Sequence, residues 1–137
     1  MKAPTHLKHK PIIAVNDYDK VDSIYANNTD VKALSIGQAQ YDDNDLSVKI
    51  WRHTGEKWSR QSEEMPLHRA LDLSILAIAA ILADTKSNYS LSNLREEIVD
   101  ENRVAEIRDY FKQHENMLRP RLEELRKILN TFFDKEK

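Results

Sequence analysis

The chain has 137 residues, of which 40% are hydrophobic and 32% charged, with 2 glycines, 4 prolines and no cysteine. This composition is typical of one folded domain over residues 1–137 rather than of a disordered chain, and the lack of cysteine excludes disulfide bonds, thiolate catalysis and cysteine-ligated metal sites. The formal net charge of −2 gives no broad positive surface, so we expect no nucleic-acid partner.

Nothing in the sequence is typical of export or of membrane insertion. Residues 1–10 are polar and lack the apolar stretch of a secretory signal, and we expect this segment to be mobile. The longest uncharged apolar run, residues 73–83, has 11 residues, which is shorter than the ~18 needed to span a membrane. The sequence therefore predicts a cytoplasmic protein without a membrane partner.

Strand-forming patterns dominate the first half of the chain. Residues 12–15 form a short β-branched run, and either Asn16 or Asp17 could cap a helix that continues to about Ala26. Residues 32–41 and 46–53 are predicted to be two antiparallel strands.

Residues 42–45 are predicted to join these two strands. The second strand has the two-residue period of a half-buried strand, in which Leu46, Val48 and Ile50 alternate with Ser47, Lys49 and Trp51. A tight turn at 54–56 would bring residues 57–60 back as a third strand, with Trp51 and Trp58 near opposite sides of that turn.

A long apolar helix is predicted to follow the strands. Pro66 suits the first turn of a helix because its missing N–H is not needed there, and Met65 would then be the cap. The helix should end near Asp84 and, because it is apolar nearly all round from Ala70 onward, we expect it at the centre of the core.

The remainder of the chain is predicted to form amphipathic helices, with Ser90 or Ser92 as the candidate cap. Pro120 should kink or break them because it removes a hydrogen bond from the helix interior. Two apolar stripes at 3–4 spacing lie on either side of it, namely Val104, Ile107, Phe111, His114 and Leu118, then Leu122, Leu125, Leu129 and Phe132. These helices either pack as a hairpin on their own core or expose a seam for a homodimer.

The predicted fold is therefore α+β, with a three-stranded antiparallel meander packed on a buried central helix and a C-terminal amphipathic helical pair. The best candidate chemistry lies where the strands give way to the central helix, at residues 58–72. The candidate ligand-binding residues are Trp58, Arg60, Glu64, His68, Arg69 and Asp72.

Asp72 is the most informative of these residues, because it is the one charge between Ala70 and Ala83 on a helix expected to be buried. A buried carboxylate needs a partner. His68 and Arg69 precede it by four and three residues, within reach on a helix. These groups are either an ion-pair network that stabilises the fold or a functional pocket.

Three functions are compatible with this segment. The leading hypothesis is a non-enzymatic binding or regulatory protein with a binding site at a polar corner. There, Arg52, Arg60 and Arg69 would recognise a small anionic ligand or a charged side chain of a protein partner. Glu63 and Glu64 bring opposing charge to that corner.

The first alternative to a binding protein is a small hydrolase. It would use His68 with Glu64 or Asp72, and its nucleophile would be Ser59 or Ser62. The second alternative is a purely structural or assembly protein, in which the same segment only holds the core together. The aromatic pair, Trp51 and Trp58, would cover the open face of the meander in preference to stacking on a ligand.

No metal site or cofactor is predicted. His6 and His9 lie in the N-terminal segment, and His53, His68 and Glu64 lack the spacing of a metal-binding motif. The acidic run at 42–45 lacks the glycine and the distal glutamate of a calcium-binding loop.

The segment Trp58-Ser59-Arg60-Gln61-Ser62-Glu63-Glu64-Met65-Pro66-Leu67-His68-Arg69, with the following Ala70-Leu71-Asp72-Leu73, resembles a small family of conserved, functionally uncharacterised bacterial proteins. The resemblance extends over most of the chain. It implies a bacterial source, and it implies neither a substrate nor catalytic residues.

Overall fold

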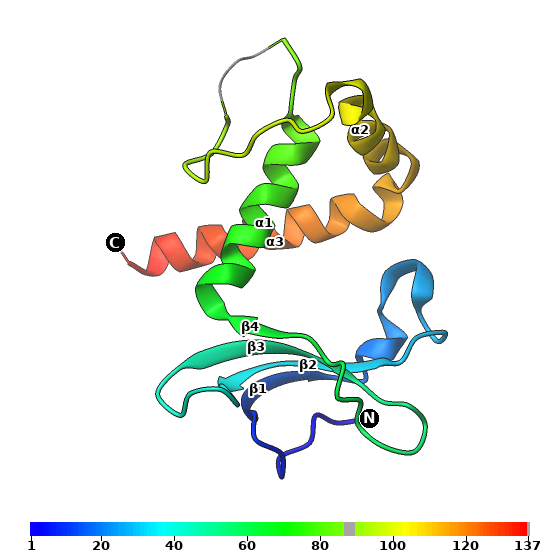
Figure 1. The fold of residues 1–137 in the computed structure, drawn as a ribbon, viewed down its shortest axis with the longest axis vertical. Coiled ribbons are helices and arrows are strands. Elements are labelled where there is room, and N and C mark those ends of the chain that lie inside the picture. Colours follow the sequence, from blue (N-terminus) through cyan, green and yellow to red (C-terminus); the bar gives the residue numbers. More distant parts are fainter. Residues whose placement is uncertain (87–89, 137) are drawn as a thin grey trace. The chain divides into compact units, whose positions relative to one another are not determined.

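The computed structural model describes residues 1–86 and 90–136. They fall into two compact units, Met1–Ser74 and Ile75–Lys137, which we call the sheet unit and the helical unit. The sheet unit contains all four strands of the described chain, and the helical unit contains α2 and α3 (Figure 1). Helix α1 (Leu67–Leu82) begins in the first unit and ends in the second.

The sheet is antiparallel, with its strands in the order of the sequence. Its strands are β1 (Lys10–Asn16), β2 (Val31–Gln38), β3 (Leu46–Arg52) and β4 (Glu64–Pro66). The predicted hairpin of the second and third of these strands is confirmed, since Leu34 faces Ile50 and Ile36 faces Val48. The sheet has one strand more than predicted, because residues 12–15 belong to β1 and pair with β2.

The predicted third strand at 57–60 is wrong in its position. Trp58 makes only an isolated bridge with His53. Beyond it, the Arg52 N–H donates to the Ser62 hydroxyl at 2.9 Å instead of to a strand carbonyl. Regular pairing with β3 resumes at Glu64, which lies opposite Lys49. A side chain thus takes the place of a backbone partner, and the chain loops out before β4.

The helix predicted after Asn16 or Asp17 is also wrong. Two short 3₁₀ turns, Tyr18–Lys20 and Ser23–Tyr25, occupy that stretch. Asp17 and Ser23 have φ angles of 55° and 54°, in the left-handed region that a continuous helix cannot include.

The two faces of the sheet differ in their burial. The more deeply buried face carries Val31, Ala33, Ser35, Ser47, Lys49 and Trp51. The opposite face carries half-buried apolar side chains, namely Leu34, Ile36, Val48, Ile50 and Met65. The alternation predicted for β3 is therefore present, and the face that carries serine, lysine and tryptophan is the buried one.

Helix α1 forms where it was predicted, but its expected burial is wrong. Pro66 is the last residue of β4 and α1 begins at Leu67. Ala79 is its only buried residue, whereas Leu71 and Leu82 are 57% and 61% exposed. The buried apolar residues of the sheet unit, Val31, Ala33, Ala39 and Trp51, lie in β2, in β3 or directly after β2, so α1 contributes none of them.

The C-terminal pair of helices is confirmed as α2 (Val104–Gln113) and α3 (Glu115–Lys135). They are preceded by a 3₁₀ turn at Glu101–Arg103, which the carboxylate of Asp100 caps by accepting from the Asn102 N–H. Ser90 and Ser92 are not helix caps. The Ser92 hydroxyl instead bonds the Glu96 carboxylate within an irregular segment.

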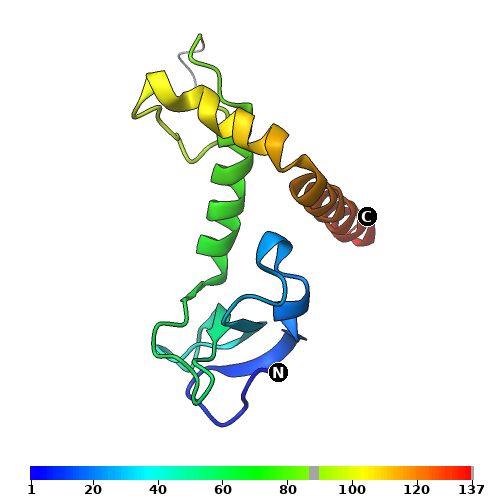
Figure 2. The same cartoon turned by 90° about the vertical axis from the view of Figure 1, so that its right-hand side faces the viewer.

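The break between the two helices lies at His114 and not at Pro120. The His114 ring stacks on Tyr110 at 4.1 Å, and its Nδ1 donates to the Tyr110 carbonyl at 2.9 Å. Pro120 lies inside α3, where it removes a single hydrogen bond, the one to the Asn116 carbonyl. Figure 2 shows α2 and α3 as successive helices with a bend between them.

Among the described residues, no helix combines the length and the apolar composition that a membrane crossing requires.

Candidate functional site

A buried polar network lies on the more deeply buried face of the sheet, and we call it the His9 network. Its members come from the segment before β1 and from β2, β3 and β4, namely His9, Ser35, Ser47, Lys49, Trp51 and Glu64. His9 and Ser47 are fully buried and Trp51 is 1% exposed. The network therefore lies inside the protein, away from solvent.

The donors and acceptors of this network can be assigned one after another. The Trp51 indole N–H donates to the Ser35 hydroxyl at 2.8 Å, which leaves the Ser35 proton to donate to His9 Nε2 at 3.0 Å. On the other side, the Ser47 hydroxyl donates to Glu64 Oε2 at 2.8 Å, so its oxygen accepts from the His9 Nδ1–H at 2.9 Å. His9 is therefore neutral, with its proton on Nδ1.

Burial of the His9 ring lowers the pKa of this histidine, and the nearby Glu64 carboxylate offsets only part of that effect. The ring also packs edge-on against Trp51, with 5.6 Å between centroids. A charged imidazole would have to donate from both nitrogens, and the Ser35 hydroxyl would then lose its acceptor. The hydrogen-bond geometry and the burial of the His9 ring therefore both favour the neutral imidazole.

Glu64 is the anion of this network. Burial alone would raise its pKa, but hydrogen bonds from the Gln40 N–H and the Ser47 hydroxyl, together with the charge of Lys49, outweigh burial and lower the pKa. Its Oε1 is buried, has no hydrogen-bond donor among the described residues, and lies 3.5 Å from Lys49 Nζ. Lys49 also lies over the Trp51 ring at 4.3 Å, a cation–π contact.

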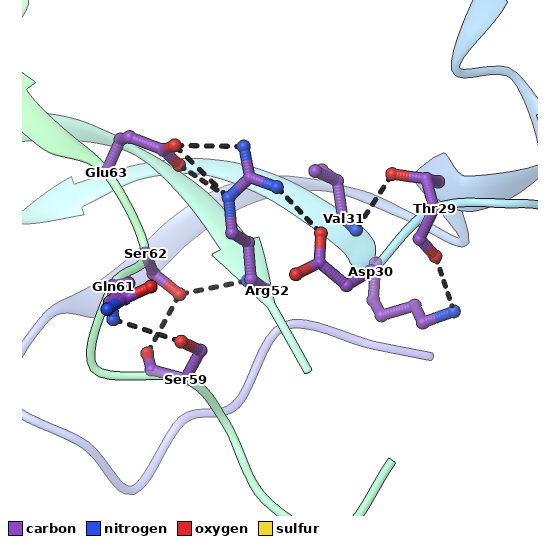
Figure 3. Close-up of polar contacts among 9 residues, drawn as sticks. Thr29, Asp30, Val31, Arg52, Ser59, Gln61, Ser62 and Glu63 are labelled. Carbon is purple, nitrogen blue, oxygen red and sulfur yellow. Dashed lines mark hydrogen bonds and ion pairs between the residues drawn. The ribbon is translucent and has the colours of Figure 1, made fainter. Parts of the chain in front are cut away.

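A second polar cluster surrounds Arg52 at the end of β3 (Figure 3). Its guanidinium donates to Glu63 through Nε and Nη2 at 2.9–3.1 Å and to Asp30 through Nη1 at 2.7 Å. Hydrogen bonds from Arg52 lower the pKa of Glu63, and the same bonds raise that of Arg52. The positive charge of Arg52 is thus neutralised by two carboxylates.

The six predicted site residues do not form one site. Glu64 points into the His9 network, and Trp58 packs edge-on against Trp51 and His53, at 5.6 and 4.9 Å. The aromatic pair does flank the turn, as predicted.

The remaining predicted residues lie outside both networks. Arg60, His68 and Arg69 are exposed and Asp72 is half-buried. Within residues 1–86 and 90–136, His68 and Asp72 do not bond to one another, although they are four residues apart on α1.

The two serines named for a hydrolase both hydrogen-bond to the backbone. The Ser62 hydroxyl donates to the Ser59 carbonyl at 3.0 Å and accepts from the Arg52 N–H. The Ser59 hydroxyl accepts from the Gln61 N–H at 3.0 Å, as Figure 3 shows. Neither of them bonds to His68.

The described part of the chain contains no group of three His, Asp or Glu side chains placed to hold a metal ion. His53, one of the three residues considered for such a site, accepts a hydrogen bond from the Gly55 N–H through Nδ1. The acidic stretch at 42–45 forms the β2–β3 connection, where the Asn44 N–H donates to the Asp42 carboxylate.

A large groove lies in the helical unit, and we call it the α1–α2 groove. Its volume is about 1210 Å³, and it is bordered by the end of α1, by residues 90–100 and by α2. Much of its lining is apolar and includes Leu76, Ala80, Leu91, Ile98, Val104 and Ile107.

The charged residues of the groove lining are predominantly acidic. Carboxylates outnumber cations among the lining residues, which include Asp84, Glu96, Glu97, Asp100 and Glu106 against Arg95 and Arg103. Arg103 is itself paired with Glu106 through two hydrogen bonds of 2.9 Å. The groove therefore has a lining that combines apolar side chains with an excess of negative charge.

Sequence reasoning missed both the His9 network and this groove. His9 lies in a polar, lysine-rich segment with no local pattern to indicate burial, and only the pairing of β1 with β2 brings it beside Ser35 and Ser47. For the groove there was a partial signal in the sequence, because α1 is apolar nearly all round and such a helix needs cover on more than one side.

Residues 1–107 match the model of a protein family described as "Family of unknown function (DUF6530)". No curated protein and no solved structure matches the chain. The matched region includes the whole sheet unit, α1 and the chain up to Ile107 in α2, which agrees with the resemblance to an uncharacterised family.

Proposed function

The chain belongs to a protein family of unknown function, DUF6530, and we propose that it is a non-enzymatic binding protein whose α1–α2 groove holds an apolar segment of a protein partner. The observation that carries this proposal is the groove itself, about 1210 Å³ with a largely apolar lining. Contiguous apolar surface of this kind is uncommon on monomers and is typical of interaction sites.

The position of the groove within the family supports a shared function. All of its lining residues except Tyr110 lie within the matched region, residues 1–107. A partner segment with apolar side chains at helical spacing would fit such a groove, as in other helix-in-groove complexes.

The His9 network gives little support to the enzyme alternative. His9, Ser47 and Glu64 have the residue types of a hydrolytic triad, but the Ser47 proton is directed at Glu64 and not at the histidine. A nucleophilic serine has to transfer its proton to the histidine and to be reached by substrate. Here the serine is fully buried, so the network is better suited to stabilising the sheet.

The polar corner remains a second candidate site, but with fewer residues than the sequence predicted. Arg60, His68 and Arg69 are exposed, and none of them forms an ion pair within the described ranges, so their charge is available to an anionic group. Replacing Arg69 with Ala should weaken such binding and leave the fold intact. Global unfolding of that variant would instead favour a structural role.

Site-specific photocrosslinking in the native host tests the groove. A photoreactive phenylalanine analogue at Ile107, which lines the groove, should give a discrete adduct that disappears when Leu76→Glu is added in the same chain. The same analogue at the exposed turn residue Lys57 is the control. If positions 57 and 107 give the same diffuse labelling, the groove is not a binding site.

A further inference from the structure

Helix α3 carries an apolar stripe that the described part of the chain covers only in part, since three of its residues are half-buried and two are exposed. Leu118, Leu122, Leu125, Leu129 and Phe132 recur every three or four residues and so share one face of the helix. No residue of α3 is buried, and Leu129 and Phe132 are 46% and 53% exposed. A helix of 21 residues is about 30 Å long, so this is an extended surface.

The charges beside the stripe are mostly positive. At about 100° per residue, Arg121 and Arg126 fall on its two sides. Arg119 lies next to Arg126 and is paired with Glu115 on that same side. Glu123 and Glu124 fall on the opposite half of the helix. The charges bordering the apolar face of α3 are therefore mainly arginines, whereas carboxylates outnumber cations in the lining of the α1–α2 groove.

These two surfaces are complementary, but they do not meet within the described part of one chain. The residues that line the groove end at Tyr110 in α2, and none of them belongs to α3. Because α3 follows α2 with only His114 between them, both surfaces are presented by the same helical unit.

We propose that two copies of the chain associate reciprocally, each seating the apolar face of its α3 in the α1–α2 groove of the other. This inference rests on the proposed function, since it names the occupant of that groove. Reciprocal exchange closes a two-fold dimer and leaves neither surface open. It also forms the contact twice, which brings one helix per copy toward the roughly 1,200–2,000 Å² buried in stable interfaces.

Sedimentation equilibrium of the full chain tests the dimer. Wild-type protein should sediment with twice the mass of one chain. Leu125→Glu, in the stripe, and Ile107→Glu, in the groove, should each raise the dissociation constant at least about 30-fold, because each buries a charge against an apolar surface. Asn116→Glu adds the same charge on the opposite face of α3 and should leave the dimer intact. A wild-type monomer at every concentration would overturn the proposal.

A mixing experiment distinguishes this exchange from direct pairing of two α3 helices. The Ile107→Glu chain keeps an intact α3 and the Leu125→Glu chain keeps an intact groove, so the two variants mixed together should form a heterodimer through one contact. Direct pairing of α3 helices would instead leave Ile107→Glu fully dimeric, and that result contradicts the proposed exchange. Both residues are partly exposed, and circular dichroism of each variant verifies that its helices are formed.

The crosslinking experiment separates the failure of this inference from that of the proposed function. An adduct at Ile107 with the mass of two chains supports both. An adduct with a different protein supports the groove as a binding site and overturns its occupation by α3. The absence of a discrete adduct, with a monomer in solution, overturns both.

Discussion

At the scale of single residues, the sheet unit depends on a histidine that is neutral and buried. Because burial lowers the pKa of His9 below its ordinary value of 6.5, the unfolded chain binds more protons at this site than the folded chain does. Stability from this site is therefore complete above about pH 6.5 and is lost as the pH falls through the lowered folded pKa.

We predict that the free energy of unfolding decreases below pH 6.5 by up to about 1.4 kcal/mol per pH unit, the limit for one proton. Urea denaturation between pH 5 and 8 measures it. A His9→Gln chain should lose this dependence, whereas His6→Gln, at an exposed histidine, should keep it. An unchanged slope in His9→Gln would show that another group causes it.

The neighbouring glutamates Glu63 and Glu64 provide a matched comparison. Glu64→Gln removes the anion beside the buried Lys49 and should cost about 2–4 kcal/mol of stability. Glu63→Gln weakens an exposed ion pair with Arg52 and should cost less than about 1 kcal/mol. Thermal or urea denaturation compares them, and equal losses would mean that the His9 network contributes no more than a surface pair.

At the scale of elements, the attachment of β1 depends on a glycine in β2. A Cβ at Gly37 would lie 1.9 Å from the Lys10 carbonyl oxygen, so only glycine allows β1 to approach this closely. Lys10 directly follows His9, and the position of β1 therefore determines whether the histidine reaches Ser35 and Ser47.

Gly37→Ala should displace the start of β1 and destabilise the protein by about 1–3 kcal/mol. It should also expose the His9 ring, which hydrogen exchange at residues 8–12 and the histidine NMR signals can detect. Gly55→Ala is the comparison, because a Cβ there meets no atom and is penalised only by its φ of 102°. Retention of His9 burial in Gly37→Ala would contradict this account.

At the scale of the whole molecule, the helical unit has very little core of its own. Ala79 is buried, and α2 and α3 contain no buried residue. A unit of this kind gains its stability from whatever covers its apolar faces.

If self-association provides that cover, stability should depend on protein concentration. The melting temperature of the wild-type chain should rise with concentration, because association favours the folded state by mass action. The Leu125→Glu chain should melt at a lower temperature that does not change with concentration. Differential scanning calorimetry over a hundredfold dilution series measures both, and a wild-type melting temperature independent of concentration would argue against the dimer.

The sequence by itself determined the elements whose signals are local. These elements are the β2–β3 hairpin, helix α1 and the C-terminal helical pair. They were predictable because apolar periodicity and turn residues depend on positions only a few residues apart. Membership of an uncharacterised family was also visible in the segment from Trp58 to Leu73.

Only the tertiary structure decided which surfaces are buried and which side chains meet. The partners of His9 lie 26 and 38 residues away in the sequence, and Glu64 bonds to Ser47 and not to a neighbour on α1. Alternation in β3 shows that the strand has two faces, but strand pairing decides which of them is covered. Burial depends on contacts between distant segments, and for that reason the polar face of β3 could become the inside of the sheet unit.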